Sequence, residues 1–398
     1  MSSLTREKLN QAVSLVPRSG ADVWLTFVRE TSMMRDPVLP LILNGGLTWE
    51  SAFIVARDGR KVAVVGNYDA DPLIASGDWD EVVPYVHGIW APLLETLEKL
   101  VPPGGKIAVN TSPDNVAADG LTHGMFLKLQ EILAGTRFSE SLVSAAETVT
   151  ALRSQKTPAE LARIRTAIAQ TDAAFAEIAA VAKVGRTERE VYDHVHRWVR
   201  DRGYGFSWDP AGDPIVNSGP DSMIGHGIPS ASIRIAPGHI FHVDLGLIVD
   251  EYASDIQRCW YVPAPGETAI PPDLEAALSA VTGAISAGSK ALRPGVRGHE
   301  VDAAARSFLV AQGYPEYLHA LGHQVGRTAH DGGAILGPRW ERYGRTPDIP
   351  IEAGEVYTLE LGVTVPNRGY LGIEEMVVVA ESGCEFPSNR QMDIPLLC

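Results

Sequence analysis

Two acidic residues interrupt an apolar stretch at residues 241–261, FHVDLGLIVDEYASDIQRCWY. The pattern predicts two strands joined by a turn, with one aspartate on each strand, Asp244 and Asp255. A turn centred between residues 249 and 250 would place the two carboxylates directly opposite each other on one face. Like charges at directly opposed positions destabilise a strand pair, so this arrangement requires a compensating group.

A second apolar stretch, residues 356–380, repeats the arrangement with glutamates. Glu360 and Glu374 are equally far from Asn367, which lies in the turn-forming segment Pro366–Gly369. The two glutamates are therefore also predicted to face each other across a strand pair.

Carboxylates on the buried faces of two strand pairs cannot all stay ionised alone, because each uncompensated buried charge costs several kcal/mol. A single strand pair of this kind could simply expose its acids to solvent, and one carboxylate pair could share a proton. Two pairs with the same arrangement favour divalent cations, which bind several oxygen ligands.

Histidines in glycine-rich loops are candidates for a further ligand. His319 and His323 lie in HALGHQVG, His330 follows in HDGG, and His226 lies in an earlier loop. Glycine beside a histidine allows close approach of the backbone. A lone loop histidine is usually solvated, but four of them near acid-bearing strands indicate a site.

The predicted elements around these segments occur twice. A capping box at residues 157–160 opens a helix to about residue 183, and a second box at 187–190 opens a helix that ends at Gly203. Residues 185–204 align with residues 295–314, although two amphipathic helices could resemble each other by chance. A duplicated helix–helix–hairpin unit predicts two half-sheets about a pseudo-twofold axis, with the site at their seam.

The first 155 residues are predicted to form a separate, smaller, mixed α/β domain. Residues 51–68 are typical of a hairpin around Asp58-Gly59. No catalytic constellation occurs there, and His87 and His123 are expected to have surface or capping roles.

Composition limits the classes of partner. The 398 residues are 45% hydrophobic and 21% charged, with a net charge of −15, which argues against binding to nucleic acid or an anionic membrane. Three widely spaced cysteines exclude a disulfide framework and suggest a reducing compartment. No apolar run of ~18 residues and no secretory signal are present, so the expected location is the cytoplasm.

Five short motifs resemble those of a known family. In order, they are HVDLG at 242–246, YASD at 252–255, GHQVG at 322–326, LELG at 359–362 and IEE at 373–375. The chain thereby resembles metallopeptidase family M24, which includes methionine aminopeptidase, aminopeptidase P and prolidase, and it looks most like prolidase. The resemblance implies an α/β pita-bread catalytic domain at 156–398, with an internal pseudo-twofold duplication, and a creatinase-like N-terminal domain at 1–155.

The resemblance also implies a ligand set for two divalent metal ions. Asp244 would bind one ion, Asp255 and Glu374 would bridge both, and His323 and Glu360 would complete the second. Oxygen-rich ligation with one imidazole suits Mn²⁺, although Co²⁺ or Zn²⁺ would also fit.

Further roles follow from the same resemblance. Glu360 would carry the proton from water to the leaving amine, and His226 and His330 would contact the substrate and stabilise the tetrahedral intermediate. Arg345 is nearest to the position of an arginine that binds the substrate's C-terminal carboxylate, with a one-residue gap.

The sequence departs from the family pattern at four positions that are not metal ligands, so the departures affect the expected substrate preference rather than metal binding. Gln257 and Cys259 stand where many members have threonine, Leu361 where most have proline, and Gly372 where many have arginine.

The expected activity is that of an Xaa-Pro dipeptidase acting through a hydroxide that bridges two metal ions, and the expected partner is a small peptide. An Xaa-Pro aminopeptidase acting on longer peptides, a non-peptidase enzyme of the same fold, and a metal-free binding protein are the alternatives. By analogy with prolidases, a homodimer is expected.

Overall fold

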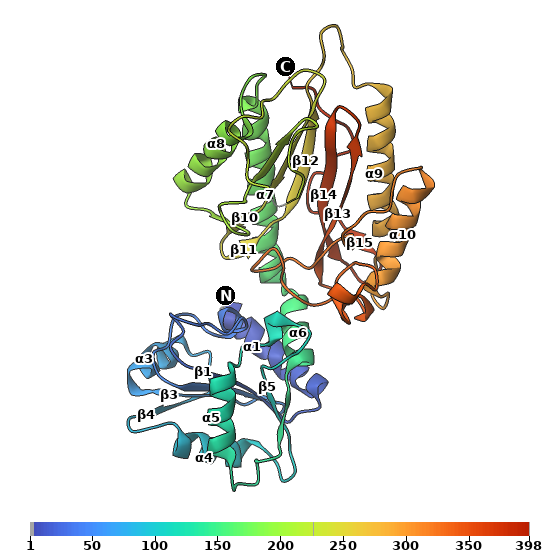
Figure 1. Cartoon of the computed structure of the whole chain (residues 1–398). Helices are drawn as coiled ribbons and strands as arrows, with labels where there is room; N and C mark the ends of the chain where they lie inside the picture. Colours follow the sequence, from blue (N-terminus) through green and yellow to red (C-terminus); the bar gives the residue numbers. More distant parts are fainter. Residues whose placement is uncertain (1–3, 226, 398) are drawn as a thin grey trace. The chain divides into compact units, whose positions relative to one another are not determined.

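Two units divide the chain, Met1–Arg153 and Ser154–Cys398 (Figure 1). The computed structural model describes residues 4–225 and 227–397. The division falls beside the predicted boundary near residue 155.

The first unit is built on a six-stranded sheet with the order β4-β3-β2-β1-β5-β6. The predicted hairpin is confirmed, because β2 and β3 pair antiparallel around Asp58-Gly59, where Gly59 has a φ of 104°. The strands are β1 (Val23–Val28), β2 (Ser51–Ala56), β3 (Lys61–Gly66), β4 (Glu81–Tyr85), β5 (Ile107–Val109) and β6 (Leu142–Ser144).

Helices cover this sheet so that both of its faces are buried. On β1, Trp24 and Val28 belong to one apolar cluster, whereas Leu25 and Phe27 belong to the other. This alternation is the two-residue period of a strand. The helices are α1 (Leu4–Leu15), α2 (Leu39–Ile42), α3 (Asn67–Ser76), α4 (Trp90–Leu100), α5 (His123–Leu133) and α6 (Ala146–Ser154), with short 3₁₀ turns η1 (Val16–Ser19) and η2 (Val116–Ala118).

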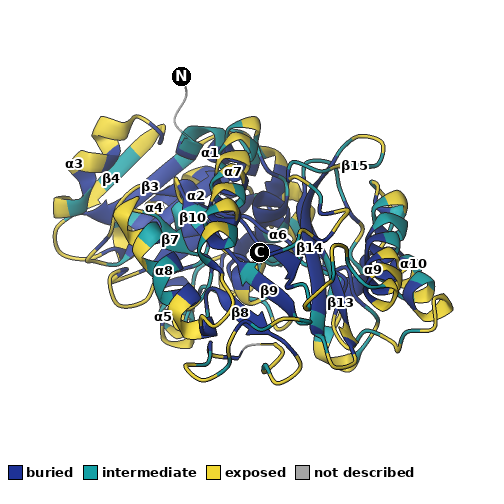
Figure 2. Ribbon diagram, turned by 90° about the horizontal axis from the view of Figure 1, so that it is seen from above, coloured by how far each residue is buried: buried dark blue, intermediate teal, exposed yellow. Residues whose placement is uncertain are grey.

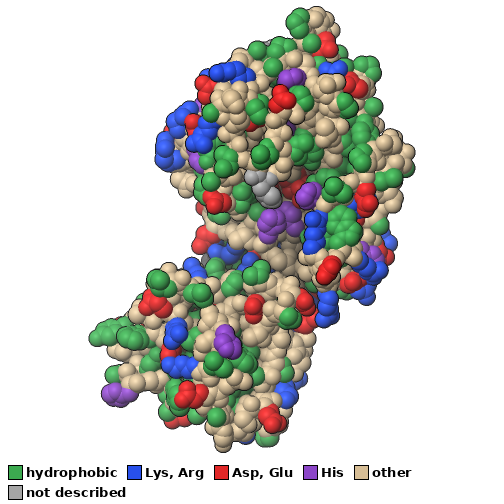
Figure 3. All heavy atoms as spheres, in the orientation of Figure 1, with side chains coloured by type: hydrophobic (Ala, Val, Ile, Leu, Met, Phe, Trp, Pro, Cys, Tyr) green, Lys and Arg blue, Asp and Glu red, His purple; other side chains and the backbone are tan. Residues whose placement is uncertain are grey.

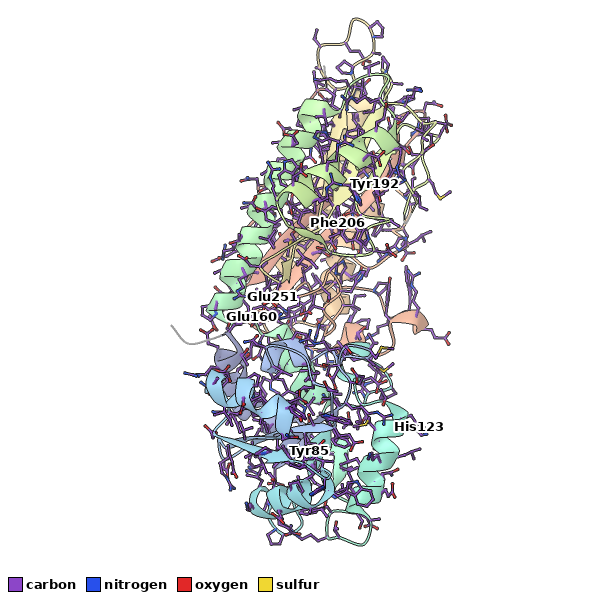
Figure 4. All side chains as sticks on the ribbon, turned by 90° about the vertical axis from the view of Figure 1, so that its left-hand side faces the viewer. Tyr85, His123, Glu160, Tyr192, Phe206 and Glu251 are labelled. Carbon is purple, nitrogen blue, oxygen red and sulfur yellow. The ribbon has the colours of Figure 1, made fainter. Side chains whose placement is uncertain are left out.

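The two histidines of the first unit lie at its surface. His87 is exposed, and the exposed His123 begins α5 directly after the capping residue Thr122 (Figure 4). The surface roles predicted for both histidines are therefore confirmed.

The second unit contains the large sheet, in the order β13-β14-β12-β9-β8, with β15 beside β14. A small sheet, β11-β10-β7, accompanies it. The strands are β7 (Gly205–Phe206), β8 (Ile215–Ser218), β9 (Ile240–Leu245), β10 (Leu247–Val249), β11 (Tyr252–Ala253), β12 (Ile256–Tyr261), β13 (Val356–Val365), β14 (Gly369–Val379) and β15 (Cys384–Glu385).

Four long helices pack beside these sheets: α7 (Pro158–Val181), α8 (Glu188–Asp201), α9 (Pro272–Ala291) and α10 (Gly298–Ala311). The first predicted capping box is present, since the backbone N–H of Thr157 donates to Glu160 (2.8 Å) and that of Glu160 donates back to Thr157 (3.3 Å). Figure 2 shows the buried strands of the large sheet and the exposed outer faces of α9 and α10. The short 3₁₀ turns η3 (Glu341–Tyr343) and η4 (Thr346–Asp348) lie in a long loop before β13.

The internal duplication is visible in the backbone. Helices α8 and α10 begin at residues 188 and 298, which are 110 residues apart. Before them, Gly185 donates to the carbonyl of Ile235 and Gly295 donates to that of Ile351, both at 2.8 Å, and both glycines are left-handed. The two halves join where β12 pairs with β14, which is the predicted seam.

Within the described residues, no helix combines the length and the apolar character needed to cross a membrane.

Candidate metal centre

One face of the large sheet carries a row of four polar side chains on adjacent strands. Asp244 on β9 is opposite Gln257 on β12, which is opposite Glu374 on β14. Glu374 is in turn opposite Glu360 on β13. Directly opposed residues project to the same side of a sheet, so these three carboxylates and one amide are neighbours. The predicted pairing of Glu360 with Glu374 is confirmed, with Asn367 at a φ of 61° in the turn.

The predicted pairing of Asp244 with Asp255 is wrong. The turn is centred on Asp250 and Glu251, which have φ values of 49° and 69°, and Val249 pairs with Tyr252 across it. This centre lies one residue later than predicted, so every partner shifts by two positions and Asp244 faces residue 257. Aspartate is common in such turns, but Glu251 stands where glycine is usual, so the local sequence indicates this left-handed turn only weakly.

Asp255 lies in a break between β11 and β12 rather than inside the ladder. Its backbone N–H donates to the sulfur of Met376 at 3.3 Å. At the same break, the Ser254 hydroxyl accepts from the backbone N–H of Leu247 at 3.0 Å, which replaces a ladder bond. Because Asp255 lies in this break, its side chain does not follow the alternation of side chains along the strand. Its carboxylate lies close to His323.

A buried acid that sequence reasoning missed, Asp213, supports this break. Its carboxylate accepts from the backbone N–H groups of Ser207 (3.0 Å) and Gly246 (3.3 Å). Its backbone carbonyl is 2.8 Å from Nε2 of His196, whose ring packs against those of Tyr192 and Phe206, both labelled in Figure 4. Burial, and secondarily the charge of Asp244, raises the pKa of Asp213 well above its usual value. Asp213 therefore fixes the backbone next to the row.

The start of α7 also anchors the hairpin that precedes Asp255. The Tyr252 hydroxyl donates to Glu160 at 3.0 Å. Figure 4 shows Glu160, at the foot of α7, close to Glu251 in the hairpin turn. The glutamate of the capping box of α7 thus also fixes the position of β11.

His323 faces two of the acids. Its Nε2 atom lies 3.7 Å from Asp255 Oδ2 and 3.6 Å from Glu360 Oε1. Its Nδ1 atom is 3.0 Å from the carbonyl oxygen of Ala329, which can only accept, so Nδ1 holds the proton and Nε2 presents its lone pair. Burial, and then the neighbouring His330, lowers the pKa of His323 to about 3, so its ring is neutral near pH 7 and suited to ligation.

The backbone holds His323 against β13. The N–H of Thr358 donates to the carbonyl of His323 at 2.9 Å. A side chain at Gly322 would place Cβ 1.9 Å from the carbonyl oxygen of Thr358, so only glycine fits. The glycine in this motif is therefore explained by close backbone approach.

The donor atoms suit a divalent cation. Ligand atoms of Asp255, His323 and Glu374 all lie within 4.8 Å of one another. Within the described part of the chain, Asp244 Oδ1 and Glu374 Oε1 are buried without a hydrogen-bond partner. Orphaned carboxylate oxygens beside a neutral imidazole match the ligand preference of Mn²⁺, Co²⁺ or Zn²⁺. Figure 3 shows acidic and histidine side chains gathered at a hollow of this unit.

Electrostatics supports the same conclusion. Burial, followed by neighbouring carboxylates, raises the pKa values of Asp244, Asp255 and Glu374 well above their usual range, and that of Glu360 to about 8. Four such acids cannot all ionise near neutral pH without a compensating positive charge. A bound cation reverses this effect by favouring the ionised ligands.

Gln257 is a member of the row that the sequence singled out only as a departure from threonine. Its amide nitrogen lies 3.2 Å from Glu360 Oε2 and 3.0 Å from Glu374 Oε2. Its amide oxygen lies 3.1 Å from Nε2 of the buried His242. The position of Gln257 between β9 and β14 could not be read from sequence spacing.

A tyrosine explains another departure, the glycine at 372. A Cβ atom there would lie 2.4 Å from the ring of Tyr370, and one at the opposed Gly362 would lie 2.4 Å from its hydroxyl. The Tyr370 ring therefore fills a slot above two glycines. It meets His242 edge-on at 5.2 Å, and its hydroxyl interacts with that of Tyr317.

The remaining predicted site residues differ in placement. His330 is exposed, with its ring centroid 4.3 Å from that of His323, and it lies at the edge of the metal centre. His226 lies outside the described residues. Arg345 is exposed where η4 begins, and among the described residues no hydrogen bond or ion pair joins it to the acidic row.

The other two arginines of the loop before β13 bind neighbouring residues. Arg339 contacts the Asp348 carboxylate through two nitrogens at 2.8 and 2.6 Å. Arg342 donates to the carbonyl of Leu318 and lies over the rings of Trp340 and Tyr343. An open hollow of about 790 Å³ lies here, lined by Leu318, Trp340, Glu341 and Arg342.

Comparison with known proteins identifies the family and the fold of this chain. The family model described as metallopeptidase family M24 matches residues 162–381. A protein of Pyrococcus furiosus named Xaa-Pro dipeptidase is 32% identical over 246 residues, which cover 61% of this chain and 65% of that protein. The match thus spans slightly less than two thirds of that relative.

Solved structures resemble the chain over nearly its full length. An Xaa-Pro dipeptidase of Bacillus anthracis has a TM-score of 0.74 at 23% identity, covering 99% of this chain and 100% of the other. An X-Pro aminopeptidase of Thermotoga maritima MSB8 has a TM-score of 0.69 at 24% identity, covering 98% and 99%. At these identities the likeness establishes the fold alone. That fold includes the pita-bread arrangement expected for residues 156–398.

Proposed function

Because the chain belongs to metallopeptidase family M24, we propose that it hydrolyses the peptide bond before proline in Xaa-Pro dipeptides. The observation that supports this best is the convergence of Asp255, His323 and Glu374 beside the orphaned oxygens of the acidic row. The name of the Pyrococcus furiosus relative supports the choice of substrate.

The proposed cofactors are two divalent cations, of which Mn²⁺ suits the donor set best. When bound, such cations would lower the pKa of water to supply a hydroxide nucleophile and would polarise the carbonyl of the scissile bond. Asp244 would hold one ion, Asp255 and Glu374 both, and His323 and Glu360 the second.

Glu360 has the properties of a proton carrier. Its side chain keeps 21% exposure, whereas that of Asp255 keeps only 7%. In the metal-free protein, burial and the charge of Asp244 raise the pKa of Glu360 to about 8. A bound cation would keep the carboxylate ionised, so that it could accept a proton from water. Glu360 would take a proton from the attacking water and pass it to the leaving nitrogen.

Proline makes this proton transfer important. The nitrogen of an Xaa-Pro bond carries no hydrogen, and it must gain a proton as the bond breaks. The exposed His330 is well placed to contact the substrate at the edge of the site, and the same role is proposed for His226.

An Xaa-Pro aminopeptidase acting on longer peptides is the second candidate. A dipeptidase needs a cation for the substrate's C-terminal carboxylate, yet Arg339 is paired with Asp348 and Arg342 stacks on aromatic rings. Arg345 is the remaining candidate in this loop.

The experiment that tests the proposal is a turnover panel with Mn²⁺ added to metal-free protein. Xaa-Pro dipeptides, Xaa-Pro-Yaa tripeptides and Xaa-Ala dipeptides would be compared by kcat/KM. Hydrolysis of Xaa-Pro alone supports the dipeptidase, and equal cleavage of the tripeptides supports the aminopeptidase. Absence of cleavage of every peptide would refute both and favour non-peptidase chemistry.

A homodimer is also proposed, by analogy with prolidases. Light scattering is expected to give roughly twice the 42.8 kDa of one chain. A mass near one chain at every concentration would contradict it.

A further inference from the structure

Gln257 lies where the two halves of the large sheet meet. It faces Asp244 on one side and Glu374 on the other, and its side chain is buried, with the residue 7% exposed. A buried amide needs partners for two N–H groups and one oxygen. Gln257 finds all of them within the site.

The two N–H groups reach two different glutamates. The amide nitrogen is 3.0 Å from Glu374 Oε2 on the adjacent strand and 3.2 Å from Glu360 Oε2 one strand farther away. These two glutamates are directly opposed, so their charges repel. One neutral amide therefore compensates two neighbouring carboxylates at once.

The amide oxygen belongs to a row of buried polar side chains. Its oxygen is 3.1 Å from Nε2 of His242, and Nδ1 of His242 is 3.0 Å from Asn217 Oδ1. The Asn217 amide nitrogen donates to the carbonyl of Met223 at 2.9 Å. Glutamates that are ionised as metal ligands can only accept hydrogen bonds, so the amide nitrogen would face them in the metal-loaded site.

In both glutamates, the atom that accepts the hydrogen bond from Gln257 is Oε2. With Oε2 held by Gln257, Oε1 of Glu374 is left buried without a partner in the described part of the chain. Oε1 of Glu360 is left 3.6 Å from Nε2 of His323. Gln257 thus turns the free oxygen of each glutamate toward the other proposed ligands.

We propose that Gln257 is a positioning residue that orients Glu360 and Glu374 as metal ligands. The inference deepens the proposed function at the level of its metal site and does not depend on the substrate. Hydrogen bonds to metal-ligating carboxylates fix their geometry, and losing such a partner costs ~10–100-fold in metal affinity.

The test is a calorimetric titration of metal-free protein with Mn²⁺, without substrate. Gln257→Leu keeps a similar shape but removes all three hydrogen bonds, and we expect roughly 10-fold weaker Mn²⁺ binding or more. Gln257→Asn keeps the amide but is one methylene too short to reach both glutamates, so an intermediate loss is expected.

Gln391→Leu is the matched control. Gln391 is also a buried glutamine bonded to β12, since its amide exchanges hydrogen bonds with the backbone N–H (2.9 Å) and carbonyl (2.6 Å) of Cys259. It is bonded away from the acidic row. Its loss should lower the melting temperature and leave Mn²⁺ affinity within about twofold of the wild type.

Two results would overturn the proposal. One is wild-type Mn²⁺ affinity in both Gln257 variants, and the other is an equal loss of affinity in Gln391→Leu, which would indicate general loosening of the strand. The turnover panel separates this inference from the proposed function. A wild type that binds Mn²⁺ but cleaves no Xaa-Pro peptide refutes the peptidase proposal and leaves the role of Gln257 intact.

Discussion

Glu355, a buried acid outside the acidic row, should make the protein lose stability as the pH rises. It is 3% exposed, just before β13, and accepts from the Tyr357 hydroxyl (2.7 Å) and the backbone N–H of Glu352 (3.0 Å). Burial is the main cause that raises its pKa from 4.5 to about 7, against the lowering effect of the hydrogen bond from Tyr357. Replacement of Glu355 by glutamine should remove this titration.

The size of the effect follows from the pKa change. An acid whose pKa is higher in the folded state costs stability once it ionises, so the cost begins near pH 4.5 and is complete above about pH 7. Each pKa unit corresponds to ~1.4 kcal/mol, so the ionisation costs about 3 kcal/mol. Glutamine keeps an oxygen that can accept from Tyr357, so Glu355→Gln should be the more stable protein at high pH.

The assay is guanidinium unfolding of the wild type and Glu355→Gln at several values from pH 4.5 to 8.5, with a chelator present throughout. Both proteins carry the same acidic row, so its titration cancels in the difference between their unfolding free energies. The exposed Glu275→Gln in α9 serves as a matched control for loss of a carboxylate.

We expect the difference between the two proteins to change by about 3 kcal/mol across this range, in favour of the variant as the pH rises. The reasoning would be refuted if the unfolding free energies of the wild type and Glu355→Gln changed in parallel with pH. Glu355 would then have the same pKa in the folded and the unfolded protein. A similar pH-dependent change in Glu275→Gln would also refute it, because the effect would then be independent of burial.

Three further predictions concern the site. Asp255→Asn should abolish Mn²⁺ binding and turnover, whereas His330→Ala should keep Mn²⁺ binding and lower only kcat/KM; metal analysis beside kinetics checks this, and normal metal content in Asp255→Asn would contradict it. Gly322→Ala should keep its far-ultraviolet circular dichroism but bind Mn²⁺ at least ~10-fold more weakly, because its Cβ would lie 1.9 Å from a carbonyl oxygen and must displace His323. Arg345→Ala should raise KM for Xaa-Pro dipeptides and weaken discrimination against tripeptides; unchanged KM and selectivity would place carboxylate recognition elsewhere.

Features that depend on local patterns were predictable from the sequence. The capping box at Thr157 and Glu160, the repeated helices α8 and α10, and the hairpin around Asp58-Gly59 all formed as expected. Glu360 and Glu374 face each other because turn-forming residues lie midway between them. In each case a few neighbouring residues contain the required information, since caps and turns satisfy backbone groups within a few positions.

Tertiary structure decided which side chains share the row. The turn at Asp250 and Glu251 lacks the usual glycine or asparagine, so the partner of Asp244 could not be derived from the turn's sequence. Gln257 meets Glu374 across 117 residues of chain, and only the pairing of β12 with β14 brings them together. Residue types and spacing therefore determine the ligand chemistry of this protein. The contacts that orient those ligands arise only when distant strands pack, because side-chain packing at a sheet seam leaves no local sequence pattern.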